Sequence, residues 1–311
     1  MWAGKDFARY AMKLRIRVPA TTANLGPGFD CLGLALDWWN AIEIETIERG
    51  LQVEVDCPEG VEIPRNRNNL VVYGMEAVYK LAGQNRPPCR IHITTRIPIA
   101  RGLGSSSAAI VGGLVAANAL LGNMYSRDEL VTIATRIEGH PDNVAPALLG
   151  GLMVAAMEAK QVTVARFPVP RELRCVLFVP EHVLLTKKAR GILPKRIPRT
   201  DAIYNASRVA LWIAALRERR WEWLEAATQD RLHQPYRAKL VPGMYELFGA
   251  AMKAGARGVA LSGAGPSIIA FAVHNGEPIA RAMMQKALQI GLSGATRIVS
   301  VSPRGAHVNA R

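Results

Sequence analysis

A glycine- and serine-rich stretch at residues 97–113, IPIARGLGSSSAAIVGG, has the residue types that bind an anion. Glycines allow the backbone to turn sharply and to approach a ligand closely. The free N–H groups at the start of the helix that follows would point at the anion, and the helix dipole would add to the attraction. The stretch lacks the Lys-Ser/Thr pair of a Walker A loop. From its residues alone, it is either a phosphate-binding loop or an ordinary serine-capped helix start.

A second polar group interrupts an apolar region at residues 136–151, RIEGHPDNVAPALLGG. Glu138, His140, Asp142 and Asn143 lie there between apolar segments, where unsatisfied polar groups are costly. A glutamate could complete the coordination of Mg²⁺, and an aspartate or asparagine could orient a reacting hydroxyl. The alternative is a turn in which Asp142 or Asn143 caps the next element.

A third glycine-rich stretch, GVALSGAGPSIIAF at residues 258–271, lies between two apolar segments that alternate like strands. It is either a tight hairpin or a second glycine loop that presses its backbone against the site formed by the first.

The three stretches, in this order, resemble the GHMP kinase superfamily of small-molecule kinases, and the similarity extends over residues 13–301. GLGSSSA resembles the phosphate loop of that family, which uses no Walker lysine. The motif VPATTANLGPGFDCLGLAL at residues 18–36 is similar to that of the branch whose substrate is L-homoserine. Galactokinases carry a Gly-Arg-Val-Asn-Leu-Ile-Gly-Glu-His type of sequence at this position, and isoprenoid kinases an Ala-Lys-Ile-Asn-Leu type.

The resemblance implies an activity, a fold and an assembly. The activity is ATP-dependent phosphorylation of the side-chain hydroxyl of L-homoserine to O-phospho-L-homoserine, with Mg²⁺, in threonine biosynthesis in the cytoplasm. The fold is the α+β, two-domain GHMP kinase fold. Its N-terminal, ribosomal-protein-S5-domain-2-like domain would be residues 1–167, with an extension at 1–12, and would bind ATP. Its C-terminal, ferredoxin-like α/β sandwich would be residues 168–311 and would complete the substrate site. A homodimer is the family expectation.

The resemblance also assigns site residues by motif. Substrate contacts would be Asn24, Asp30, His140, Thr186, Arg190 and Arg237. Mg²⁺ would be held by Glu138 with either Ser105 or Ser106, and Glu138, Asn143 and Asp142 would form the catalytic group. The nucleotide would contact Asn69, with Leu70 and Val71 beside the adenine, and Pro98, Arg101, Gly102, Leu103, Gly104, Ser105, Ser106, Ser107, Gly263 and Gly265. Whether a side chain acts as a general base is left open.

The chemistry of such a substrate agrees with these residue types. L-homoserine is a zwitterion with a primary hydroxyl, and its carboxylate suits a pair of planar, bidentate guanidinium groups. Arg190 and Arg237 would supply that pair, and Asp30 would accept from the ammonium group. Phosphoryl transfer requires mainly positioning and charge neutralisation.

The composition is consistent with a large protein that has an anionic partner. The chain has 311 residues, half of them apolar, and a formal net charge of +14. Its length predicts two domains. The charge indicates either a nucleic acid or a small anionic substrate, and the scattering of basic residues in short runs favours the substrate.

Neither a secretory signal nor a zinc-type cysteine spacing is visible. The first residues are charged and lack an apolar core. Residues 102–126 are uncharged, but polar residues at both ends leave the apolar part too short for a bilayer, so we expect a buried helix. The four cysteines form no CxxC pair and are expected to be reduced.

The elements that position these stretches follow from hydrophobic periodicity. Strands are predicted at 13–18, 41–45, 51–55 and 90–94, and helices at 69–82, 108–121 and 126–137, the last with a Ser-x-x-Glu capping box. Beyond residue 168 the sequence predicts strands at 174–180, 257–262, 267–273 and 297–301, and helices at 202–217, 221–231, 244–254 and from 278.

Three other functions are weighed. A kinase of the same superfamily for a mevalonate-like alcohol disagrees with the motif at 18–36. A non-catalytic, ligand-binding member would be expected to have lost the phosphate loop, Glu138 or Asn143, which are all present. A nucleic-acid-binding protein would be expected to interleave aromatic with basic residues, and this chain does not.

Overall fold

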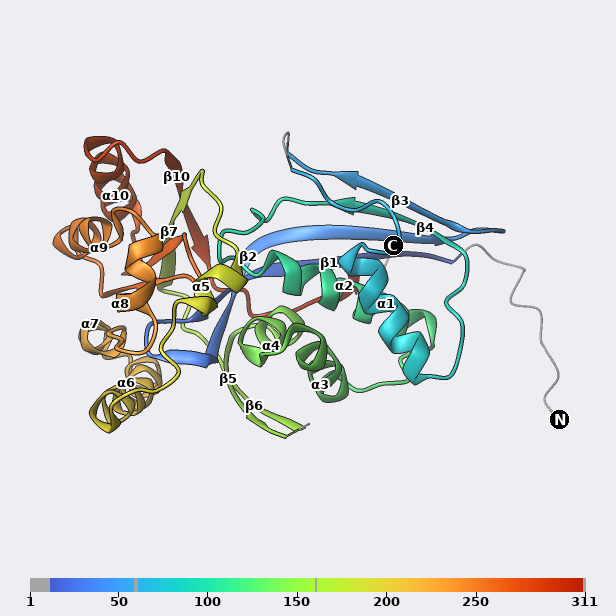
Figure 1. The fold of residues 1–311 in the computed structure, drawn as a ribbon, viewed down its shortest axis with the longest axis horizontal. Helices are drawn as coiled ribbons and strands as arrows, with labels where there is room; N and C mark the ends of the chain where they lie inside the picture. The colour runs from blue at the N-terminus through green and yellow to red at the C-terminus, as the bar shows by residue number, and fades with distance from the viewer. Residues whose placement is uncertain (1–11, 59–60, 160, 310–311) are drawn as a thin grey trace.

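Two β-sheets organise the chain in this computed structural model, which describes residues 12–58, 61–159 and 161–309 (Figure 1). The first sheet has seven strands and the second has four. The strands are β1 (Lys13–Asn24), β2 (Gly28–Thr46), β3 (Leu51–Asp56), β4 (Cys89–Thr94), β5 (Leu152–Glu158), β6 (Gln161–Phe167), β7 (Leu173–Pro180), β8 (Gly258–Leu261), β9 (Ile268–Val273), β10 (Gly294–Ser300) and β11 (His307–Asn309).

The first sheet is built on the long hairpin of β1 and β2. Its strand order is β11-β1-β2-β4-β3, and β2 also pairs with β5, which pairs with β6. Every pair is antiparallel except β3 with β4. The alternation of β1 and β2 buries Ile16, Val18, Ile42 and Ile44 on one face. The other face carries charged side chains such as Arg15 and Glu43, which form an ion pair.

Four helices cover the buried face of this sheet: α1 (Leu70–Leu81), α2 (Ser105–Leu120), α3 (Arg127–Glu138) and α4 (Pro141–Leu149) (Figure 1). Helix α2 is apolar on all sides and is buried along most of its length, as predicted. Helix α3 begins after Ser126 with the predicted capping box, in which the Ser126 and Glu129 side chains cap one another's backbone N–H groups.

The second sheet has the order β10-β7-β9-β8 and is antiparallel throughout. Its own core includes Phe178 and Met283. The ring of Trp212 packs edge-on against Phe271 at 5.6 Å, and these two side chains belong to the core that is continuous with the first sheet. The helices of this half are α5 (Thr186–Gly191), α6 (Arg199–Glu218), α7 (Leu224–Ala227), α8 (Gln234–Arg237), α9 (Met244–Lys253) and α10 (Glu277–Gln289), with 3₁₀ turns η1 (Trp221–Trp223) and η2 (Ala238–Leu240).

The end of the described chain returns to the first sheet, where β11 pairs with β1. The carbonyl of Ala35 in β2 also accepts a hydrogen bond from the N–H of Ser302. Because of these hydrogen bonds, the described residues after β10 belong to the first sheet. The division of the chain between residues 167 and 168 stays a prediction.

Several elements differ from the sequence-based expectation. The predicted helix at 221–231 is only the turn η1 followed by the short α7, because the carboxylate of Asp230 accepts from the N–H groups of the next residues and starts a new turn. Residues 141–149 form α4, with a proline in its first turn. The alternative in which Asp142 or Asn143 caps the next element is wrong, because His140 is the N-cap and both residues lie inside the helix. β5 and β6 were not predicted. Within the described residues, no helix combines the length and apolarity that a membrane span needs.

Candidate active site

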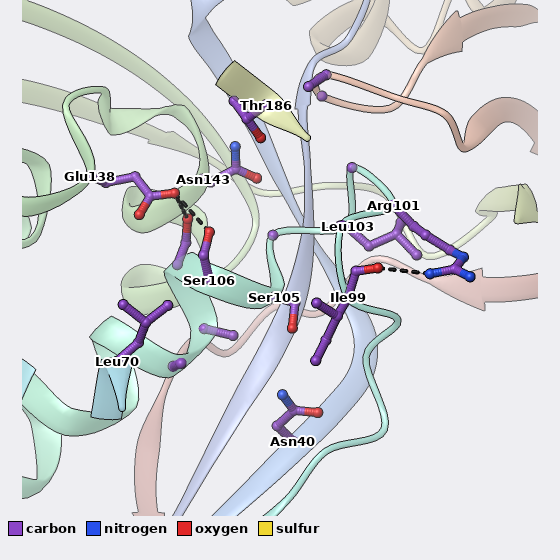
Figure 2. Close-up of a pocket in the computed structure, with 18 of the residues that line it drawn as sticks. Asn40, Leu70, Ile99, Arg101, Leu103, Ser105, Ser106, Glu138, Asn143 and Thr186 are labelled. Atoms are coloured by element: carbon purple, nitrogen blue, oxygen red, sulfur yellow. Dashed lines mark hydrogen bonds between the residues drawn. The ribbon is translucent and has the colours of Figure 1, made fainter. Parts of the chain in front are cut away.

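A cleft of about 340 Å³ contains most of the residues singled out by the sequence motifs (Figure 2). Three of those residues do not line it: Asp30, Pro98 and Gly265. The ones that do are Asn24, Asn69, Leu70, Val71, Arg101, Gly102, Leu103, Gly104, Ser105, Ser106, Ser107, Glu138, His140, Asp142, Asn143, Thr186, Arg190, Arg237 and Gly263.

The first glycine-rich stretch enters α2 without a side-chain cap. Gly104 is the N-cap, with a φ of 66°, and the three serines are the first residues inside the helix. The alternative of a serine-capped helix start is therefore wrong. Ala108 donates the first helical hydrogen bond, to the Gly104 carbonyl. The N–H groups before it have no partner within the helix, so this end of α2 is suited to an anion.

Glycine is required in this loop because two other segments touch its backbone. A Cβ on Gly104 would lie 1.8 Å from the Thr21 hydroxyl oxygen of β1. A Cβ on Gly102, whose φ is 71°, would lie 2.1 Å from the carbonyl oxygen of Ser262, in the turn between β8 and β9. Both approaches leave no space for a side chain.

Two of the loop serines reach Glu138 at the end of α3. The hydroxyls of Ser106 and Ser107 donate to Oε1 of Glu138 at 3.0 and 2.9 Å. The Ser105 side chain points to the opposite side of the cleft (Figure 2). Of the two serines considered for a metal, Ser106 is therefore the one that lies beside the acidic residue.

Two predicted nucleotide contacts have side chains bonded to the chain itself. The Arg101 guanidinium donates to the carbonyls of Ile99 at 2.8 Å and Pro180 at 2.7 Å, and also to that of Glu181. It thereby fixes the glycine loop to the end of β7. Asn69 caps α1 by accepting from the Val71 N–H, and its amide donates to the Pro64 carbonyl. Both residues hold the walls of the cleft in place.

A hydrogen-bonded chain links α4 to β1 on the floor beside Glu138. The Thr21 hydroxyl donates to Oδ1 of Asn143 at 2.7 Å, and His140 Nδ1 lies 2.5 Å from Oδ1 of the buried Asp142. Burial alone would lower the pKa of His140, but the hydrogen bond and charge of Asp142 outweigh it, and the pKa is raised. Asp142 thus orients the imidazole.

Charged groups gather at the end of the cleft toward the second sheet. Arg190 of α5 binds Asp30 through its two terminal nitrogens, Nη1 at 3.0 Å and Nη2 at 2.5 Å, and this hydrogen bonding raises the pKa of Arg190. Asp30 has a φ of 56° and donates its N–H to the side chain of Asn24. The ring of Phe29 lies under both Arg190 and Arg237, at 5.2 and 5.4 Å.

Arg237 is 1 % exposed, and among the described residues no carboxylate forms an ion pair with it. It donates to the carbonyls of Ala189 and Gly263 and to Nδ1 of His233 at 3.2 Å. Burial and the charge of Arg190 lower its pKa to about 10, so it stays protonated at neutral pH. No hydrogen bond within the described chain occupies its Nη2, which is left for a ligand in the cleft.

His233 was missed by the sequence motifs, although it holds Arg237 in place. Its Nε2–H donates to the Gly26 carbonyl at 2.6 Å, which leaves Nδ1 unprotonated to accept from Arg237. Asp230 in turn accepts from the N–H groups of His233 and Gln234. The sequence does contain a signal for this turn at residues 230–237: Asp230 can cap the N–H groups of the residues that follow it.

The third glycine-rich stretch is both a hairpin and part of the site. β8 and β9 pair directly, and the turn between them contacts the glycine loop before α2. The Ser262 hydroxyl donates to the Gly102 carbonyl at 2.7 Å. The Gly263 carbonyl accepts from the Asn24 amide and from Arg237.

Comparison with known proteins gives the family. Models of the GHMP kinases N terminal domain and the GHMP kinases C terminal domain match residues 69–151 and 212–295. The homoserine kinase of Carboxydothermus hydrogenoformans is 44% identical, over 94% of this chain and 95% of its own length. The homoserine kinase of Caldicellulosiruptor bescii is 46% identical, over 85% and 86%. The chain belongs to the homoserine kinase family of GHMP kinases.

Solved structures agree with this placement. The crystal structure of the homoserine kinase from Cytophaga hutchinsonii superimposes with a TM-score of 0.88 at 29% identity, over 98% of this chain and 100% of that one. The mevalonate kinase of L. major, at 14% identity and a TM-score of 0.73, shares the fold alone. The expected α+β GHMP kinase fold and kinase activity are thereby confirmed for a homoserine kinase family member.

The buried His233 predicts how stability responds to acid. Burial lowers its pKa from 6.5 to about 4, so the unfolded chain binds a proton there that the folded chain does not. The contribution of neutral His233 to the free energy of unfolding is therefore fully present above about pH 6.5 and is lost as the pH falls toward 4. We expect urea unfolding to show a steeper loss in the wild type than in His233→Gln, by up to about 1.4 kcal/mol per pH unit.

The control for that measurement is His92→Gln, whose side chain lies on the exposed face of β4. It should keep the pH dependence of the wild type. An unchanged pH dependence in His233→Gln would contradict the neutral, buried state of His233.

Proposed function

We propose that the chain transfers the γ-phosphoryl group of ATP to the side-chain hydroxyl of L-homoserine, giving O-phospho-L-homoserine for threonine biosynthesis. The observation that carries the proposal is the pairing of two chemistries in one cleft. One end of the cleft has the uncapped N-terminus of α2. The other end has the charges of Arg190 and Arg237, with Asp30 bonded to Arg190 behind the lining. The family membership supports the same reaction. A cytoplasmic homodimer is the part of the proposal that rests on family resemblance alone.

The nucleotide end supplies hydrogen-bond donors and a positive dipole. We propose that the triphosphate lies over Gly102 to Ser107, where the N–H groups of the first turn of α2 are free of helical partners. Such fixed donors stabilise the charge that develops on the transferred group without having to reorganise.

The oxygen atoms beside this loop fit a magnesium ion. Glu138 and the Ser106 hydroxyl lie 3.0 Å apart at the cleft, and Mg²⁺ prefers one or two protein oxygens together with substrate phosphates. Bound there, Mg²⁺ would neutralise phosphate charge during transfer. Oε1 of Glu138 also accepts from Ser107, which holds the carboxylate in this orientation.

The other end has the charges that a zwitterion needs. Arg237 offers its free Nη2, and Arg190 a second guanidinium, for the carboxylate, while Asp30 would accept from the ammonium group. Because Asp30 and Arg190 satisfy one another without substrate, the ligand must replace a bidentate ion pair. A ligand with only one charge would leave one partner of that pair unsatisfied, and this favours an amino acid over mevalonate.

The reacting hydroxyl would lie between the two ends. Thr186 and Asn143 face the cleft there (Figure 2), and Asn143 is fixed by the Thr21 hydroxyl. Asp142 is already committed to His140, which leaves it a positioning role. Holding the hydroxyl within about 3–3.5 Å of the γ-phosphorus accounts for much of the rate in such transfers.

The first prediction from this proposal concerns the acceptor. In a coupled ADP-release assay with Mg-ATP, we expect turnover with L-homoserine and only background rates with mevalonate, L-threonine or no acceptor. A preference for mevalonate would point to the alcohol-kinase alternative, and acceptor-independent hydrolysis or no turnover would contradict the proposal.

A second prediction concerns Arg237. Arg237→Ala should raise the KM for L-homoserine by at least about 30-fold, since it removes a buried charged donor, and should leave the KM for ATP within about twofold. Lys239→Ala, an exposed neighbour in the same segment, is the matched control and should behave as wild type. Thermal melts of each variant would check folding. An unchanged homoserine KM in folded Arg237→Ala would remove Arg237 from the site.

A further inference from the structure

Asn40 is a buried polar side chain that lines the cleft. Asn40 and Ile42 of β2 point to the same face of the first sheet, beside Ile93 and Thr95, because Ile42 pairs with Ile93. All four line the cleft, under the start of α2. Asn40 is only 5 % exposed. None of the motifs at 18–36, 97–113, 136–151 or 258–271 includes it.

The orientation of the Asn40 amide is fixed by the chain that follows β4. Its Oδ1 accepts from the N–H groups of Arg96 at 2.7 Å and Ile97 at 2.9 Å. Two backbone donors on one atom identify that atom as the oxygen and use both of its lone pairs. The nitrogen, Nδ2, is therefore on the other side, and no described residue accepts from it. Figure 2 shows Asn40 facing the cleft below Ser105 and Ile99.

The surroundings of Nδ2 indicate what it binds. Ile42 and Ile93 lie beside Asn40, and the cleft lining also includes the apolar side chains of Ile63, Leu70 and Ile99. They suit a flat ring. The donors for phosphate lie at the N-terminus of α2, next to Glu138. A fixed N–H donor beside apolar side chains fits an uncharged acceptor on an aromatic ring.

We propose that Asn40 Nδ2 donates a hydrogen bond to an unprotonated ring nitrogen of adenine and so takes part in selecting the nucleobase. The inference rests on ATP being the phosphoryl donor. A fixed donor cannot rotate to become an acceptor, because turning the amide would place two backbone N–H groups against an NH₂ group. Asn40 can therefore select for a base that has a hydrogen-bond acceptor at this one position of the ring.

The test uses Asn40→Asp with ATP analogues that each lack one ring nitrogen: 1-deaza-ATP, 3-deaza-ATP and 7-deaza-ATP. Asp keeps an oxygen for the Arg96 and Ile97 N–H groups, so the loop is preserved while the donor is lost. In the wild type, we expect one of the three analogues to have a KM about five- to tenfold above that of ATP, the effect of one neutral hydrogen bond. In Asn40→Asp that analogue should be as good as ATP or better, because a carboxylate repels the ring nitrogen.

Ile93→Val is the matched control, because it loosens the same floor without removing a donor. It should raise the KM of ATP and of all analogues by a common factor. The KM for L-homoserine should stay unchanged in both variants.

Two results would overturn the inference. The first is that Asn40→Asp changes the KM of ATP and of every deaza analogue by the same factor. The second is that Asn40→Asp changes the KM of ATP but not that of 2′-deoxy- or 3′-deoxy-ATP, which would assign Asn40 to the ribose. Wild-type turnover with ATP and L-homoserine tests the proposed function separately. The wild type could turn over ATP and L-homoserine without the predicted difference between the deaza analogues. That result would contradict the role of Asn40 and leave the proposed function intact.

Discussion

The close contact between two glycine turns is the constraint on which the rest of the site depends. Gly102, at the start of the phosphate loop, touches the carbonyl of Ser262 so closely that no Cβ fits, and Ser262 donates back to the Gly102 carbonyl. One turn belongs to the first sheet and its helices, and the other to the second sheet. Because the Gly263 carbonyl accepts from Arg237, the same contact sets the distance between the glycine loop before α2 and Arg237.

Burying the charge of Arg237 costs free energy, and the groups that surround Arg237 offset part of this cost. Arg237 is buried without a carboxylate partner among the described residues. His233 accepts a hydrogen bond from Arg237 and, because it is neutral, does not repel the guanidinium. Carbonyl groups satisfy the other donors. The result is a buried cation that lacks a counter-ion and favours an incoming carboxylate. Nearby, Asp30 and Arg190 form an ion pair that neutralises both charges.

Local signals and the family resemblance account for different parts of this structure. The Ser-Glu capping box, the all-apolar α2 and the alternation of β1 could be predicted, because each depends on neighbours in the chain. The extent of the 19-residue β2 could not, since its pairing with β5 is set by tertiary contact. His233 and Asn40 were missed for the same reason. Their hydrogen bonds are made with partners distant in sequence, Gly26 for His233 and the loop after β4 for Asn40.

The most direct test of this account compares two serines of one turn. Ser262 joins the two halves of the site, whereas Ser267 is equally buried and its hydroxyl has no hydrogen-bond partner among the described residues. At saturating Mg-ATP and L-homoserine, Ser262→Ala should lower kcat by about tenfold or more, because the hydroxyl and the γ-phosphate lose their alignment. Ser267→Ala should keep the wild-type kcat. Equal kcat values for Ser262→Ala, Ser267→Ala and the wild type would contradict the claim that this contact aligns the substrates.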